Sequence, residues 1–148
     1  MPNFKKKEAT SLAEEKLVKS GCSDENTTGI IEGIIDAELS GIKSHGFHYL
    51  PIYCNHLKIG KINGDSRPSL EKISNSALKV NADNGFAHSG INKGLPVLLE
   101  MCEKEGISSM SIYNSYNCGV LGFHTKRIAE KGFVGLGFTN APASIAPL

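Results

Sequence analysis

The stretch SALKVNADNGFAHSG, residues 76–90, is where the pattern of this 148-residue sequence changes from helical to strand-like. Ala77 and Lys79 fall on one side of its first half, and Leu78 and Val80 fall on the other, which is the two-residue period of a β-strand. The Asn-Gly pair that follows favours a tight turn. We therefore predict that a strand opens a sheet here and ends in this turn.

The sequence after this turn alternates between helical and strand-like segments. GLPVLLEMCEKEG predicts a helix from about Leu95 to Glu105, and ISSMSIYN predicts a strand at 107–114. A further helix is predicted over 119–132, and FVGLGFTN predicts a further strand at 133–140. A strand–helix–strand series of this kind is typical of two parallel strands joined by a crossover helix.

Three helices are predicted before the turn-rich loop at 61–69, and a glycine ends each of them. The first carries a capping box, in which Ser11 and Glu14 exchange side-chain and backbone hydrogen bonds. The second has acidic residues in its first turn and isoleucines at helical spacing, and the third begins with a proline. We expect these helices at residues 11–21, 23–41 and 51–60.

These elements predict an α/β fold in which an N-terminal helical segment, residues 1–65, is followed by a mixed α/β sheet region, residues 66–148. We expect the sheet region to be incomplete at the C-terminus, because a strand with a single crossover needs more sheet beside it. The chain is then the front part of a longer protein. An apolar surface around Phe133 to Phe138 would lack its partners, and such a surface favours association.

Composition argues against several classes of protein. The formal net charge is +1, and Lys and Arg do not gather in one patch, so we expect no nucleic-acid partner. No apolar run approaches the ~20 residues that span a bilayer, so we expect no membrane partner. The four cysteines are widely spaced and form no CxxC pair, which indicates a reducing, cytoplasmic location.

Histidines gather in KSHGFHYLPIYCNH, residues 43–56, and raise the question of a metal site. His45, His48, Cys54 and His56 carry nitrogen and sulfur atoms that could bind a metal ion. Two ligands on one helical face prefer a separation of three or four residues, and Cys54 and His56 are two apart. The chain has neither HExxH nor paired CxxC, so we expect no metal site.

Proton transfer suits the same stretch better. His45 lies between Ser44 and Gly46, just before the proline that begins a helix, so the backbone beside it is free to approach a ligand. An imidazole with an ordinary pKa of about 6.5 exchanges protons near neutral pH. The alternative, a half-buried histidine that caps a helix, is the more frequent case when only the residues are considered.

A second polar segment, NSYNCGVLG, lies between a predicted strand and a predicted helix. Its residues Asn114, Ser115 and Asn117 precede backbone N–H groups that are oriented to bind an anion. The glycines form only GxxG, which is a weak signal, and the alternative is a polar turn that caps a helix. Thr139 and Asn140 follow the next predicted strand and would stand beside this loop at one edge of the sheet.

Three stretches together resemble a known family. SHGFHYLPIY, NADNGFAHSG and the segment from NSYNCG to the end of the chain resemble, in this order, the malate/L-lactate dehydrogenase family, the non-Rossmann NAD(P)-dependent oxidoreductases that include ureidoglycolate dehydrogenase and diketogulonate reductase. The resemblance extends from about the second predicted helix to the end. Members of the family are much longer, which agrees with an N-terminal fragment.

This resemblance implies a malate/L-lactate dehydrogenase-like fold, with residues 66–148 forming the first, truncated part of a cofactor-binding domain. It implies hydride transfer between NAD or NADP and a small 2-hydroxy or 2-oxo acid, or a 2-imino acid, in a homodimer when full length. The family's acid falls on His45, which Ser44 would orient. The positions that line the cofactor fall on Asn114, Ser115, Asn117, Gly119, Thr139 and Asn140.

Two positions depart from the family's pattern. Asn117 stands where the family commonly has histidine, and an amide cannot exchange protons near pH 7. Tyr49 stands where the family often has arginine, and a phenol offers one hydrogen bond where a guanidinium offers two. We expect both residues to bind substrate, with His45 alone transferring protons. The alternatives are a catalytically incomplete relative that at most binds nucleotide or a partner chain, and a metal-binding module.

Overall fold

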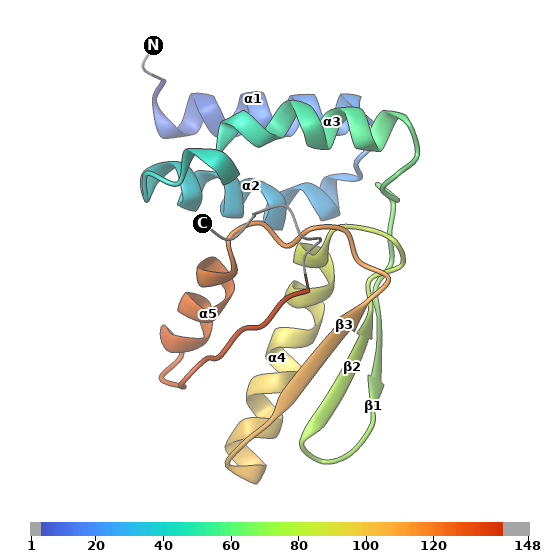
Figure 1. Cartoon of the computed structure of the whole chain (residues 1–148), viewed down its shortest axis with the longest axis vertical. Coiled ribbons are helices and arrows are strands. Elements are labelled where there is room, and N and C mark those ends of the chain that lie inside the picture. The colour runs from blue at the N-terminus through green and yellow to red at the C-terminus, as the bar shows by residue number, and fades with distance from the viewer. Residues whose placement is uncertain (1–3, 141–148) are drawn as a thin grey trace, which may run out of the picture.

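The computed structural model describes residues 4–140. Three helices form one layer, and two further helices and a three-stranded sheet lie beneath it (Figure 1). Helix α2 lies between α1 and α3 on one side and α4 and α5 on the other (Figure 1). The elements are α1 (Lys6–Lys19), α2 (Asp24–Leu39), η1 (Lys43–His45), η2 (Phe47–Tyr49), α3 (Leu50–Lys58), β1 (Ser69–Lys72), β2 (Ala77–Asn81), α4 (Ala87–Glu105), β3 (Ser109–Tyr113) and α5 (Leu121–Ala129).

The three predicted N-terminal helices are present, and the glycines that were expected to end them, Gly21, Gly41 and Gly60, all have positive φ. Such a backbone conformation suits glycine because it has no Cβ. Their apolar faces meet in one buried cluster that includes Leu17, Ile30 and Tyr53. Burial of these faces, rather than helix propensity alone, therefore holds the layer together.

The start of α1 differs from the prediction. The helix begins at Lys6, and its first turn is closed by the Lys5 backbone N–H, which donates to Glu8 Oε2 at 3.2 Å. The capping box predicted at Ser11 and Glu14 is therefore wrong, because both residues lie inside the helix. The lysines and alanine before Ser11 are good helix formers, so the helix extends through them.

The sheet has the order β1-β2-β3, and its central strand confirms the strand predicted in the opening stretch. Strand β2 alternates between half-buried and buried residues, as its sequence pattern requires. It pairs in parallel with β3, which confirms the strand predicted at 107–114, and α4 makes the crossover between them. Strand β1 pairs antiparallel with β2 and was not predicted, because only one of its four residues is partly buried and the rest are exposed.

Helix α4 is longer than the sequence predicted, since it begins at Ala87 rather than at Leu95. Two glycines and Pro96 interrupt the helical pattern in the sequence. The glycines are required by packing. A Cβ on Gly90 would lie 3.3 Å from Val80 Cγ1, and a Cβ on Gly94 would collide with the Met110 sulfur, so the helix sits close against the sheet.

The strand predicted at 133–140 is wrong, and with it the crossover through α5. No strand among residues 4–140 pairs with this segment, and alternating residues make a strand only where a neighbour supplies backbone hydrogen bonds. Its glycines pack against α5. The alternate side chains Val134, Leu136 and Phe138 are 93%, 79% and 89% exposed, which matches the expected unpartnered apolar surface.

The division of the chain at residue 65 stays a prediction. The boundary falls in the loop between α3 and β1, and the helical layer packs onto α4 and α5. Within the described part of the chain, every helix is too short or too polar to cross a membrane.

The two layers meet where α2 carries glycine. A Cβ on Gly29 would lie 2.5 Å from Asn92 Nδ2, and a Cβ on Gly33 would lie 2.9 Å from His88 Nε2. The two glycines are one helical turn apart, and so are the two α4 residues that they face. The absence of side chains on this stripe of α2 thus lets the first turns of α4 approach closely.

We expect Gly33→Ala to lower the free energy of unfolding by about 1–2 kcal/mol, although alanine is the better helix former, because the new methyl group overpacks the contact with His88. Urea unfolding followed by circular dichroism measures this change. Gly122→Ala, in the exposed first turn of α5, has its nearest neighbouring atom at 3.9 Å and should leave stability unchanged or slightly higher. Equal effects of the two substitutions would contradict the packing argument.

Candidate functional site

The predicted acid lies in the short turn between α2 and α3. Ser44 Oγ is 2.9 Å from His45 Nδ1, and the His45 ring stacks on the Tyr49 ring with an interplanar angle of 7° and centroids 6.2 Å apart. The turn is fixed from α2, because the Phe47 backbone N–H donates to Glu38 Oε2 at 3.1 Å. The His45 side chain is half-buried, so its movement is restricted while part of the ring stays accessible to a ligand.

Aromatic rings continue from this turn into the core. The Tyr49 and Tyr53 rings meet edge to face with centroids 5.0 Å apart. Tyr53 in turn meets Phe86 at 5.0 Å and Tyr116 at 6.0 Å in the same manner. Tyr53 is 1% exposed, and this burial raises the pKa of its phenol, which therefore stays protonated at physiological pH.

The loop that follows β3 is docked on the turn that follows β2. Asn114 has φ +48, a left-handed conformation that asparagine tolerates, and its carbonyl accepts from the Asn84 N–H at 2.7 Å. The Tyr116 N–H donates to the Gly85 carbonyl at 2.8 Å. Because β2 and β3 are parallel, both turns leave the same edge of the sheet.

Asn117 joins this loop to the aromatic rings. Its Oδ1 accepts from the Tyr53 phenol at 2.8 Å and from the Gly119 backbone N–H at 2.7 Å. The structure therefore links Tyr49, on which His45 stacks, to the distant Asn117 through the buried Tyr53.

The other residues predicted to bind the cofactor make fewer contacts with His45, Tyr49 and Asn117. Asn114 and Ser115 are exposed on the docked loop, and Gly119 lies at its end with φ +66. Thr139 and Asn140 are exposed, and no hydrogen bond between described residues joins them to the loop. The expectation that a strand would carry them to the same sheet edge is wrong, because the segment before them is not in the sheet.

Two buried histidines beside this loop were given no role by the sequence analysis. His88 on α4 and His124 on α5 are 2% and 6% exposed, and their ring centroids lie 5.2 Å apart. His124 Nε2–H donates to the Cys118 carbonyl at 2.8 Å. Both Nδ1 atoms are buried without a partner among the described residues. No spacing in the sequence marks this pair, because its members come from separate helices.

Burial sets the protonation of these histidines. It lowers the pKa of His88 to about 3, with His124 and Arg127 contributing further in the same direction. The pKa of His124 is also lowered, first by burial, while its hydrogen bond to the Cys118 carbonyl opposes that shift. The pair is therefore neutral at physiological pH and acts as part of the packing between α4 and α5.

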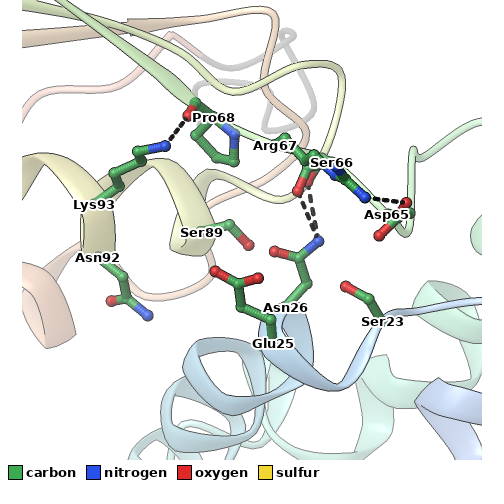
Figure 2. A pocket seen from close by; sticks show the side chains of 10 residues that line it. All are labelled: Ser23, Glu25, Asn26, Asp65, Ser66, Arg67, Pro68, Ser89, Asn92 and Lys93. Atoms are coloured by element: carbon green, nitrogen blue, oxygen red, sulfur yellow. Dashed lines mark hydrogen bonds and ion pairs between the residues drawn. The ribbon is translucent and has the colours of Figure 1, made fainter.

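A polar hollow of about 570 Å³ lies elsewhere, between the N-terminus of α2, the loop at 65–68 and the start of α4. Figure 2 shows Asn26 reaching from α2 toward this loop, and its Nδ2 donates to the Gly64 and Ser66 carbonyls, each at 3.0 Å. The Lys93 ammonium, from α4, donates to the Pro68 carbonyl at 2.6 Å (Figure 2). These polar groups serve to anchor the loop.

A shallower groove of about 380 Å³ lies where α1, α2 and α5 meet. Neither hollow is lined by His45, Tyr49 or Asn117. Over residues 4–140, no group of three or more histidine, cysteine or acidic side chains is placed to hold a metal ion, so His45, His48, Cys54 and His56 do not converge as a metal-binding module would require.

The chain matches the family model for malate/L-lactate dehydrogenase over residues 4–148. It is 31% identical to (2R)-3-sulfolactate dehydrogenase (NADP(+)) of Chromohalobacter salexigens, over 95% of this chain and 42% of that protein. It is also 31% identical to Delta(1)-pyrroline-2-carboxylate reductase 1 of Burkholderia ambifaria, over 95% of this chain and 41% of that protein. The chain thus spans about two fifths of the length of these relatives.

Solved structures show the same arrangement of elements. Malate dehydrogenase from Entamoeba histolytica superposes with a TM-score of 0.82 and 25% identity, over 88% of this chain and 37% of that chain. Malate dehydrogenase from Pyrococcus horikoshii gives a TM-score of 0.82 at 21% identity, over 88% of this chain and 38% of that chain. These similarities confirm the predicted fold.

We expect the buried histidine pair to make stability depend on pH. Between the ordinary pKa of 6.5 and the folded-state pKa of about 3, the unfolded chain binds a proton at His88 that the folded chain excludes. Above pH 6.5 the free energy of unfolding does not depend on titration of this group. Below pH 6.5 it falls by at most about 1.4 kcal/mol per pH unit. Urea unfolding between pH 7 and 4 measures this slope.

The slope should become shallower in His88→Gln, whose amide does not titrate, and should persist in His48→Gln, which replaces an exposed histidine. An unchanged slope in His88→Gln would show that the pair does not control the acid sensitivity of the fold.

Proposed function

We propose, because this chain belongs to the malate/L-lactate dehydrogenase family, that it takes part in NAD(P)-dependent transfer of hydride between the cofactor and a small 2-hydroxy or 2-oxo acid, or a 2-imino acid. The names of its relatives support this range of substrates, since they are a sulfolactate dehydrogenase, a malate dehydrogenase and a pyrroline-2-carboxylate reductase. In each reaction a carbon beside a carboxylate gains or loses hydride, and the oxygen or nitrogen on that carbon gains or loses a proton.

The observation that carries the proposal is the contact between Ser44 Oγ and His45 Nδ1 at 2.9 Å. When the serine hydroxyl donates to Nδ1, the neutral imidazole holds its own proton on Nε2. That proton is available to the oxygen or nitrogen on which negative charge develops as hydride arrives. Ser44 thus orients the ring, and stacking on Tyr49 restricts its rotation.

The chain also offers groups that suit a nicotinamide nucleotide, which would supply the hydride when bound. Asn114, Ser115 and Asn117 carry amide and hydroxyl groups that would hydrogen-bond the nucleotide, and Gly119 lets the backbone turn sharply beside them. We include Thr139 and Asn140 in this set on the family's pattern. Tyr49 is proposed to contact the substrate with a single hydrogen bond in place of the two that an arginine would make.

Association and location complete the proposal. A homodimer is supported by the exposed apolar side chains of the segment at 133–138, which need a cover in water. A cytoplasmic location is supported by four cysteines that are all free. We retain residues 1–65 as a helical segment and 66–148 as the first part of the cofactor-binding domain, with small molecules as the ligands and neither nucleic acid nor membrane as a partner.

A second candidate function is binding without catalysis. Asn117 stands where the family commonly has histidine, and an amide cannot transfer protons. This residue favours a catalytically incomplete relative that binds the nucleotide or a partner chain.

A fluorescence titration with NADH and with NADPH, followed by an oxidation assay with oxaloacetate or Δ1-pyrroline-2-carboxylate, separates the two functions. We expect cofactor binding followed by turnover. Binding without turnover would favour the second candidate, and absence of cofactor binding would contradict the first candidate and leave a partner chain as the ligand in the second.

We expect His45→Ala to lower turnover by roughly 10²–10⁴-fold, which is the usual contribution of one acid–base group. His48→Ala is the matched control, because His48 is an exposed histidine of the adjoining turn and should leave turnover unchanged. Equal turnover in the wild type and in His45→Ala would exclude His45 as the acid.

A further inference from the structure

The orientation of the Asn117 amide follows from its neighbours. The Gly119 backbone N–H can only donate, so the side-chain atom 2.7 Å from it must be the carbonyl oxygen Oδ1. The Tyr53 phenol lies 2.8 Å from the same oxygen and must therefore donate to it. Two donors thus occupy the carbonyl end of the side chain.

The opposite end of the amide is available. Asn117 Nδ2 makes no hydrogen bond to any residue from 4 to 140, and it is not among the buried side-chain atoms that lack a partner. The oxygen is therefore held by two donors, while the NH2 group has no hydrogen-bond partner among the described residues. A ligand that reaches Asn117 meets only N–H donors.

Tyr53 is well placed to hold this orientation. Its ring is 1% exposed and is packed edge to face against Tyr49, Phe86 and Tyr116. A phenol with so little freedom fixes the position of its hydroxyl oxygen and so the position of the amide, while a flipped amide would leave the Gly119 N–H facing an NH2 group.

We propose that Tyr53 is a positioning residue that locks Asn117 as a hydrogen-bond donor to an anionic oxygen of the 2-oxo or 2-imino acid. The inference rests on the proposed function for the identity of that ligand. A histidine at this position could transfer a proton to the ligand. The Asn117 amide can only donate hydrogen bonds, because its two N–H bonds do not break near neutral pH. Asn117 therefore binds and orients the ligand and leaves the proton transfer to His45.

The test uses Asn117→Asp, because this substitution separates binding from structure. The aspartate keeps an oxygen to accept from Tyr53 and Gly119, so the fold should keep its stability. It replaces the NH2 group by a second oxygen, which repels an anionic ligand. With NADH saturating and oxaloacetate varied, we expect KM to rise at least about tenfold, as for the loss of a hydrogen bond to a charged group.

Tyr53→Phe tests the positioning role. The ring packing is kept and the hydroxyl is removed, so the amide keeps only the Gly119 N–H as its anchor and is held less firmly, and KM should rise about two- to tenfold. The matched control is Tyr113→Phe, which removes the hydroxyl of an exposed tyrosine on β3 and should leave KM unchanged. A KM that is unchanged in Asn117→Asp, or equal in Tyr53→Phe and Tyr113→Phe, would overturn the inference while leaving the proposed function intact.

NMR supplies a readout that does not require turnover. The side-chain NH2 signals of Asn117 should shift when oxaloacetate is added to the wild-type chain with NADH, and the Gly119 amide signal should shift in Tyr53→Phe. If the wild type does not turn over, a shift of the Asn117 signals supports ligand binding by the locked amide. Signals that do not move on addition of oxaloacetate overturn it.

Discussion

The close approach of α2 and α4 is the constraint on which the other contacts of this structure depend. It exists because Gly29 and Gly33 leave the surface of α2 bare where His88 and Asn92 arrive. Asn92 then accepts from Arg127 Nη1 at 2.8 Å, and His88 packs on His124, so α5 is located by the same two residues. Gly119 also lies against His88, which brings the end of the polar loop to this point.

The candidate site takes its geometry from both layers. His45 and Tyr49 belong to the turns after α2, whereas Asn117 belongs to the loop after β3. Tyr53 contacts both sets, since its ring packs on Tyr49 and its hydroxyl donates to Asn117. The relative position of the proposed acid and the proposed ligand-binding amide is therefore set by how firmly the helical layer sits on the α/β part.

The sequence predicted the elements whose signals are local. The glycines after α1, α2 and α3 and the alternation in β2 are readable from a few neighbouring residues. The sequence analysis missed the start of α4, because packing against Val80 and Met110 determines it. It missed strand β1, because that strand forms through backbone pairing with β2. The false strand at 133–140 has the same origin, since its pattern is correct and its pairing partner is absent from the described residues.

For the site, the family's pattern located the residues but not their connections. His45 and Asn117 could be named from their motifs, whereas Tyr53 and the buried histidines acquire meaning only from contacts between distant segments. The parallel pairing of β2 with β3 has a bearing on folding kinetics. These strands cannot meet until the chain between them, α4 included, has closed into a loop, and that closure loses entropy before any pairing energy is gained. The helical layer, built from neighbours in sequence, can form early, and ordering of α4 against it would then nucleate the sheet.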